Sequence, residues 1–144
     1  MNRRKLAPAN IVILVAGIVM LIASFMAFYR LPFPGGSVSV NAWDHGLFMI
    51  ATLPTLLGAF MALQVGLVAF GRIDMPNRVL GLTWDQAHLV LALQSALLMG
   101  AFLALDKAPY EFGAGFWLML AAAIALVVGA LMRIATSRRR PRAI

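Results

Sequence analysis

The 144-residue sequence contains no cysteine and very little charge. Without cysteine the chain forms no disulfide, no thiolate metal site and no thiol redox centre. The four-helix membrane thiol oxidoreductases are therefore excluded. Charged residues make up 12% of the chain and only five are acidic. No two carboxylates share one apolar segment, so the sequence does not predict a pair of carboxylates acting as general acid and base within a segment.

Most of the sequence is apolar, with hydrophobic residues making up 62% of the chain. Four apolar segments, 9–29, 43–70, 82–105 and 112–132, each reach the roughly 20 residues that cross a hydrocarbon core. Because unpaired backbone groups are costly in lipid, each segment is expected to be helical. The sequence predicts an all-α fold: one transmembrane domain over 1–144, an antiparallel bundle of four membrane-spanning helices, with a basic cytoplasmic tail at 133–144.

The first ten residues have the charge of a signal-peptide n-region. The apolar run that follows, 11–28, is long for a signal peptide, and no A-x-A cleavage pattern closes it. We therefore expect a retained first helix.

The basic residues are distributed unevenly between the two predicted sides. One side has three in 3–5, two in 72–78 and five in 133–142, whereas the other has only Arg30 and Lys107. By the positive-inside rule this predicts a multi-pass membrane protein with both termini cytoplasmic. We expect the membrane to be a bacterial inner membrane. Nucleic acid is not an expected partner, because no basic face is interleaved with exposed aromatics. Candidate contacts to anionic lipid head groups of the cytoplasmic leaflet are Arg72, Arg78, Arg133, Arg138, Arg139 and Arg140.

The outer loop 30–42 combines turn residues with a strand-like pattern. Val38 and Val40 alternate with serines, which predicts a short β-like segment lying over the outer end of the bundle. Asn41, followed three residues later by Asp44, is typical of a helix start.

Two further patterns concern helix geometry. Thr83 and Gln86 match a capping box that would open the third helix. Pro54 lies inside the second apolar segment and predicts a kink, with Thr52 and Thr55 bonding the freed carbonyls.

Few polar side chains lie within the predicted spans: the candidate intramembrane contacts are Gln64, Asp85, His88 and Gln94. Counted from the inner helix ends, Gln64 and His88 fall at nearly the same depth, about 10 Å in, so we expect a hydrogen bond between them. Asp85 and His88 are open to two interpretations. They could form a proton-relay or ligand site, or they could be a helix-start carboxylate and an interfacial histidine without such a role; the pattern favours the second interpretation. Gln94 lies on another face and is expected to meet a different helix or another subunit.

Small residues recur every fourth position in three segments, a spacing that allows close helix contact within one chain or between copies. The candidate packing positions are Gly58, Ala62, Gly66, Ala92, Ala96, Gly100, Ala104, Ala121, Ala125 and Gly129.

No catalytic, cofactor or metal site is predicted. His45 and His88 are expected at opposite membrane faces, whereas a metal needs several convergent ligands. Ser95 lies two helical turns from His88, without the contact that a nucleophile and its base require.

Three stretches carry a resemblance to a known group: SVSVNAWDHGLF at 37–48, GLTW at 81–84 and FGAGFWLMLAAAIALVVGALM at 112–132. Together they resemble small four-span membrane proteins of actinobacteria, which implies the four-span layout and assigns no activity to any residue. In outline the chain also looks like claudins, but their paired loop cysteines are absent, which argues against a shared function.

These features together predict a non-enzymatic membrane component that acts through helix and loop contacts in a structural, accessory or assembly role. One alternative is a homo-oligomeric channel or small-molecule carrier, and another is a lipid-binding or sensing protein. The expected partners are membrane lipids and either further copies of the chain or another membrane protein.

Overall fold

The computed structural model describes residues 6–44, 46–47, 49–71, 75–76, 78–105 and 108–138. Most of these residues belong to four helices: α1 (Pro8–Ala23), α2 (Thr52–Phe70), α3 (Trp84–Ala104) and α4 (Ala114–Arg138). Short strands fill the connections: β1 (Tyr29–Phe33), β2 (Gly36–Val40), β3 (Arg78–Val79), β4 (Leu82–Thr83) and β5 (Glu111–Phe112). The fold is thus mostly helical, as predicted, with more strand than the sequence suggested.

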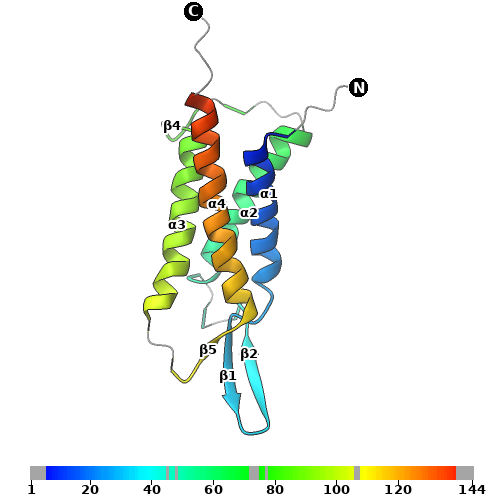
Figure 1. Ribbon diagram of the computed structural model, residues 1–144, viewed down its shortest axis with the longest axis vertical. Coiled ribbons are helices and arrows are strands. Elements are labelled where there is room, and N and C mark those ends of the chain that lie inside the picture. Colours follow the sequence, from blue (N-terminus) through cyan, green and yellow to red (C-terminus); the bar gives the residue numbers. More distant parts are fainter. Residues whose placement is uncertain are drawn as a thin grey trace, which may run out of the picture.

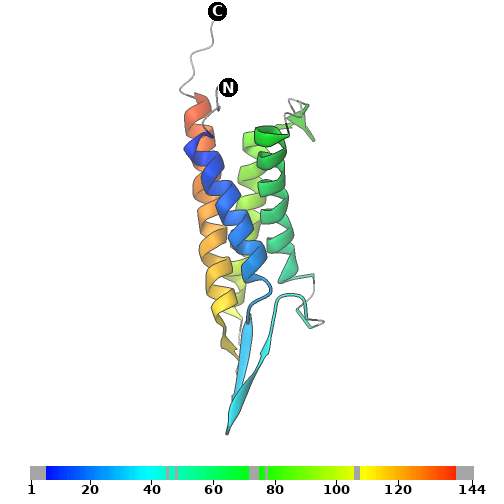
Figure 2. The same cartoon turned by 90° about the vertical axis from the view of Figure 1, so that its right-hand side faces the viewer.

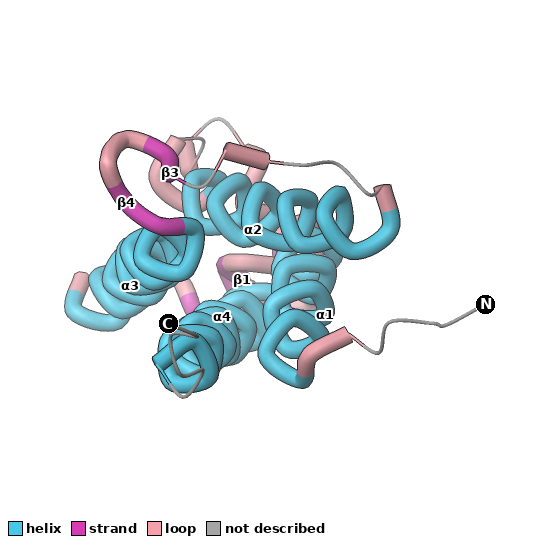
Figure 3. Tube along the Cα trace, turned by 90° about the horizontal axis from the view of Figure 1, so that it is seen from above, coloured by secondary structure: helices cyan, strands magenta, loops and turns pink. Residues whose placement is uncertain are grey.

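The helices run alternately up and down and form a ring. Each helix packs on the next in sequence, and α4 closes the ring by packing along α1. Figure 3 shows this order from above, and Figure 1 shows the start of α1 and the end of α4 at the end opposite the β1–β2 hairpin. The connections from α2 to α3 and from α3 to α4 are short, which favours antiparallel neighbours, whereas the longer α1–α2 connection carries the β1–β2 hairpin.

Three of the helices, α2, α3 and α4, are long and apolar enough to cross a membrane. α1 is equally apolar but has 16 residues, ending six residues before the predicted position 29. Large side chains such as Ile13, Met61 and Phe116 fill the interior. The outward faces are also apolar, as at Ile22, Phe60 and Leu131. Apolar residues on both the inside and the outside are typical of a bundle surrounded by lipid.

A three-stranded antiparallel sheet in the order β2-β1-β5 projects beyond the helix ends at which α1 finishes and α4 begins, the ends that the sequence predicts to be outer. The predicted strand at Val38 and Val40 is confirmed as β2. Its expected position over the bundle is wrong: Figure 2 shows the hairpin extending away from the helices. The sheet starts where Phe28 N–H donates to the Val40 carbonyl at 2.7 Å, pairing that the local sequence did not predict.

The predicted second helix, 43–70, begins only at Thr52, because residues 41–44 form a turn held by their own side chains. Asn41 Oδ1 accepts from the Trp43 N–H at 2.8 Å, and Asp44 Oδ2 accepts from the Asn41 N–H at 2.7 Å. The helix-start signal therefore stabilises a turn here. Trp43 Nε1 also donates to Ser24 Oγ at 2.9 Å, which holds this turn against the end of α1.

The predicted kink at Pro54 is wrong, because Pro54 is the third residue of α2. In the first helical turn the N–H that proline lacks has no helical acceptor, so its loss breaks no bond. Thr52 Oγ1 instead accepts from the Met49 N–H at 2.9 Å. Thr55 Oγ1 is buried and has no partner among the described residues.

The start of α3 agrees with the sequence. Thr83 Oγ1 accepts from the Gln86 N–H, and Gln86 Oε1 accepts from the Thr83 N–H at 3.0 Å, so the predicted capping box is confirmed. Just before it, β3 and β4 form a two-residue hairpin through Leu80 and Gly81, both at positive φ. Glycine suits this conformation, so the tight turn brings the chain directly into α3.

The last helix, α4, begins two residues later and ends six residues later than the predicted 112–132. Phe112 belongs instead to β5, opposite Tyr29 of β1. At the other end, helix continues through Arg133 to Arg138. Part of the predicted tail 133–144 is therefore helical, and residues 139–144 lie outside the described part of the chain.

Candidate functional site

A cluster of polar side chains joins α3 and α4 near the end of the bundle that carries the termini. Asp85 and His88 lie one turn apart on α3, and Arg133 and Ser137 lie one turn apart on α4. Arg133 Nε donates to Asp85 Oδ1 at 2.8 Å, and Ser137 Oγ donates to Asp85 Oδ2. Arg133 Nη1 lies 3.0 Å from His88 Nδ1. One arginine thus contacts two of the three polar side chains that the sequence singled out on α3.

The arginine contact determines how His88 carries its proton. A guanidinium only donates hydrogen bonds, so Nδ1 of His88 is the acceptor and the proton of the neutral ring lies on Nε2. The side chain is fully buried, and Nε2 has no partner in the described part of the chain. Trp84 packs against the ring edge, with centroids 6.3 Å apart.

The predicted Gln64–His88 hydrogen bond is wrong. The two side chains are both buried, but Gln64 Nε2 contacts Met75 Sδ at 3.6 Å and His88 Nδ1 contacts Arg133. Gln64 Oε1 has no partner among the residues that the structure describes. It borders a cavity of about 60 Å³ with Asn10 and Arg133 in its wall. That space is large enough for a water molecule, which needs such polar partners.

This cluster pairs a positive with a negative side chain and thereby connects α4 to α3. Arg133 and Asp85 neutralise one another, and the side chains remain only 19% and 23% exposed. Ser95 lies away from His88, with Oγ 3.4 Å from the Pro54 carbonyl oxygen of α2. Its Oγ also lies 3.7 Å from Met20 Sδ, so the contacts of Ser95 join α3 to α2 and α1.

The predicted lipid-contact arginines divide into three groups. Arg133 points into the bundle toward Asp85, so its guanidinium is already paired. Arg78 and Arg138 are exposed. Arg72, Arg139 and Arg140 lie outside the described residues, as does His45.

Two of the predicted small residues, Gly58 and Ala62, lie where α2 comes closest to α1. Their partner is Gly17, which the sequence pattern did not single out because it is an isolated glycine in α1. A Cβ on Gly17 would lie 2.5 Å from the Gly58 oxygen and 2.6 Å from Ala62 Cβ. Gly129 of α4 has the same role against Ile13 of α1.

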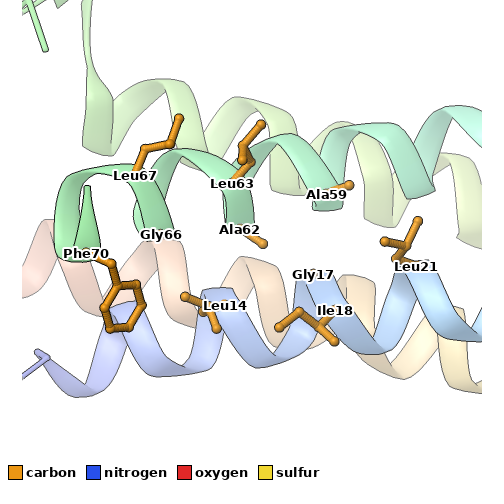
Figure 4. Close-up of a pocket in the computed structure, with 10 residues that line it drawn as sticks. All are labelled: Leu14, Gly17, Ile18, Leu21, Ala59, Ala62, Leu63, Gly66, Leu67 and Phe70. Carbon is orange, nitrogen blue, oxygen red and sulfur yellow. The ribbon is translucent and has the colours of Figure 1, made fainter. Parts of the chain in front are cut away.

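The other predicted packing residues are less enclosed. Ala92 is buried, Ala96 and Ala125 are half-buried, and Ala104 and Ala121 are exposed. A Cβ on Gly66 or Gly100 would meet nothing within 4 Å. Gly66 lines an open apolar groove of about 360 Å³ between α1 and α2, shown in Figure 4. Leu14 and Phe70 line one end of it, and Leu21 lines the other. Its walls offer dispersion contacts and no polar chemistry.

The outer hairpin presents one apolar face and one polar face. Tyr29 pairs with Val40, Leu31 with Val38 and Phe33 with Gly36, and side chains two apart in a strand point to the same side. The base of this face is half-buried at Tyr29, among Phe28, Phe102 and Phe112. Toward the tip, Phe33 and Val38 are 50% and 56% exposed. The apolar face is covered at its base and open at its tip.

Gln94 lies on the outward face of α3 and is exposed. The sequence predicted that Gln94 meets a different helix or another subunit; its exposure within the described chain leaves contact with another subunit as a prediction. Val90, Leu97 and Ala101 follow the same face and are also exposed.

Comparisons with known proteins give no assignment: no family model matches the chain, and neither a curated protein nor a solved structure is similar enough to give a match.

Proposed function

We propose that the protein is a non-enzymatic component of a bacterial cytoplasmic membrane, which docks another protein on the outer side through the tip of the β1–β2 hairpin. All four helices cross the membrane, and both termini are cytoplasmic. The lengths and apolar character of α2, α3 and α4 support this placement. For α1, 16 residues give about 24 Å, and the apolar residues that follow at 25–28 extend the span toward the roughly 30 Å of a hydrocarbon core.

The observation that carries the docking role is the uncovered apolar face of the hairpin tip. An exposed Phe33 and Val38 on a projecting hairpin offer an apolar contact to a partner. β2 is the end strand of the sheet, so one of its edges carries backbone groups that pair with no strand of the described chain. Such an edge accepts an added strand from another protein, with main-chain hydrogen bonds supplying affinity and side-chain contacts supplying specificity.

The polar cluster has a supporting role in this proposal. Arg133, Asp85 and His88 join α3 to α4 at the inner end, while β1 and β5 join the chain after α1 to the start of α4 at the outer end. The two connections hold the helices that position the hairpin.

Lipid binding is the second candidate, favoured by the groove between α1 and α2. Its lining, from Leu14 to Phe70, is apolar and open, which suits an acyl chain of the surrounding bilayer.

Site-specific photocrosslinking in native membranes tests the docking role. A photoreactive amino acid replaces Val38 at the hairpin tip or, as the matched control, Leu80 at the exposed tip of the inner β3–β4 hairpin. We expect a discrete protein adduct from position 38 and a different pattern from position 80. The variant Phe33→Asp, with the photoreactive residue kept at position 38, should lose the adduct while the helices remain folded. Lipid adducts alone at position 38, or an adduct unchanged in Phe33→Asp, would exclude docking through the tip.

A further inference from the structure

Gln94 occupies the middle of α3, with ten residues of the helix on either side of it. At 1.5 Å per residue it lies about 15 Å from each end, close to the centre of a hydrocarbon core. Its side chain is exposed, and its amide has no hydrogen-bond partner among the described residues. An amide has two N–H donors and a carbonyl acceptor, and leaving them unpaired in an apolar medium is costly.

The outward face of α3 differs in this respect from those of the other helices. In the described chain, the exposed positions of α1 and α2 are apolar, and those of α4 are apolar as far as Ala135. Lipid therefore suits three outward faces and leaves a polar group unpaired on the fourth. This asymmetry indicates that the α3 face has an occupant other than lipid.

We propose that the occupant is a second copy of the chain, packed α3 against α3, with the two Gln94 amides hydrogen-bonded to each other. Two copies with the same membrane orientation, related by a two-fold axis along the membrane normal, place each residue of α3 at the same depth as its counterpart. The amide group is self-complementary, since the N–H of one copy donates to the carbonyl of the other and the reverse. A different protein would need its own polar group at this depth, whereas a second copy supplies it by symmetry.

The residues around Gln94 suit such a contact. Leu97, one turn toward the outer end, is 73% exposed and supplies an apolar side chain to pack against the partner helix. Ala101 and Ala104 continue the face toward the outer end, and both are exposed. Small side chains there let the two helices approach, which brings the amides within hydrogen-bonding distance. The inference depends on α3 crossing the membrane, as proposed above, and is independent of docking at the hairpin tip.

Cysteine crosslinking tests this arrangement directly, because the chain has no cysteine of its own. Leu97→Cys places a thiol on the α3 face, and Val128→Cys places one on the outward face of α4, where Val128 is 47% exposed. Mild oxidation in native membranes should give a disulfide-linked dimer from Leu97→Cys and little from Val128→Cys. Co-expression of chains with two different tags identifies the occupant, since a second copy gives a product that carries both tags.

The role of Gln94 is tested in the Leu97→Cys background. Intramembrane hydrogen bonds of this kind contribute enough that Gln94→Leu should weaken association by about threefold to thirtyfold. Gln94→Asn keeps a self-complementary amide and should retain most of the dimer. Unchanged thermal stability of the monomer in Gln94→Leu excludes misfolding as the cause. Equal crosslinking at positions 97 and 128, the absence of any product that carries both tags, or full dimerisation of Gln94→Leu would each overturn the proposal, and none bears on the adduct at Val38.

Discussion

Gly17 of α1 and Gly58 of α2 face each other where the two helices cross, so closely that a Cβ on Gly17 would lie 2.5 Å from the Gly58 carbonyl oxygen. Real Cβ atoms do not approach an oxygen to that distance, so a side chain at Gly17 forces the helices apart. The close approach therefore depends on the glycine at position 17, whereas a Cβ on Gly58 would meet Met20 Sδ at 2.8 Å.

Replacing Gly17 by alanine should lower the free energy of unfolding by about 1–3 kcal/mol, the usual cost of overpacking a tight contact. Gly100→Ala is the matched control, because a Cβ there meets nothing within 4 Å. Denaturant titration of both variants in detergent, followed by circular dichroism, measures the difference. Equal stability of the two variants would show that α1 and α2 do not approach as closely as described.

Asp85 and Arg133 should be energetically coupled. Either Asp85→Asn or Arg133→Leu removes a charge-assisted hydrogen bond and should cost about 1–3 kcal/mol. The double variant should cost less than the sum, with a coupling of about 0.5–3 kcal/mol, as expected for residues in contact. Arg138→Leu combined with Asp85→Asn serves as the control, because Arg138 is exposed at the end of the same helix. Additive effects of Asp85→Asn and Arg133→Leu in unfolding titrations would contradict the ion pair.

Thr83→Ala should destabilise the start of α3 by about 1 kcal/mol, because the side-chain acceptor of the capping box is lost. Thr83→Ser keeps a hydroxyl, so its free energy of unfolding should remain close to that of the unaltered protein. Hydrogen exchange at the Gln86 amide, which donates to Thr83, reports the loss locally. If the serine variant exchanges as fast as the alanine variant, the hydroxyl is not what protects this amide.

Tyr29 should ionise at higher pH than a free tyrosine, because burial raises the pKa of its hydroxyl above the ordinary value. A raised pKa in the folded state means that neutral Tyr29 contributes stability below the unfolded pKa, and that this contribution disappears as pH rises through the folded pKa. In the variant Tyr110→Phe only one tyrosine remains, so the change in ultraviolet absorbance that accompanies tyrosine ionisation reports Tyr29 alone. Tyr29→Phe should remove this part of the alkaline destabilisation. If Tyr29 ionised at the same pH as a free tyrosine standard, that result would contradict its burial.

Part of the fold was predictable because some features are encoded locally. The capping pattern of Thr83 and Gln86 correctly places the N-cap of α3 at Thr83. The alternation of valine and serine around Val38 correctly predicts a strand. The four helices follow from the length of the apolar runs, since such runs form helices wherever lipid surrounds them.

The ends of the other helices were not predictable, since hydrophobicity does not mark them. Residues 25–28 are as apolar as α1, and the helix ends before them because Phe28 and Tyr29 pair with Val40, which lies eleven or more positions away. Such pairing is decided by tertiary contacts and leaves little trace in the local sequence.

The site was missed for a related reason. Placing the end of the last helix at 132 left Arg133 outside the predicted span, among the head-group residues. With six more helical residues, Arg133 comes to the depth of Asp85, and opposite charges at one depth would have suggested the pair. Gln94 could be singled out from the sequence, because a polar residue in the middle of an apolar helix needs no tertiary information to be recognised; that it meets another subunit stays a prediction.

The outer sheet has a mechanical consequence. Gly113 N–H donates to the Phe28 carbonyl at 2.8 Å and Gly115 N–H to the Ala27 carbonyl at 2.9 Å, so the segment after α1 and the first residues of α4 are fastened together at the base of the hairpin. A pull on the hairpin would load α1 and α4 together through these backbone bonds, and would also reach α2 through the backbone that follows β2. The α3 helix has no such direct connection to the hairpin, so it would receive the load through the helices that it packs against.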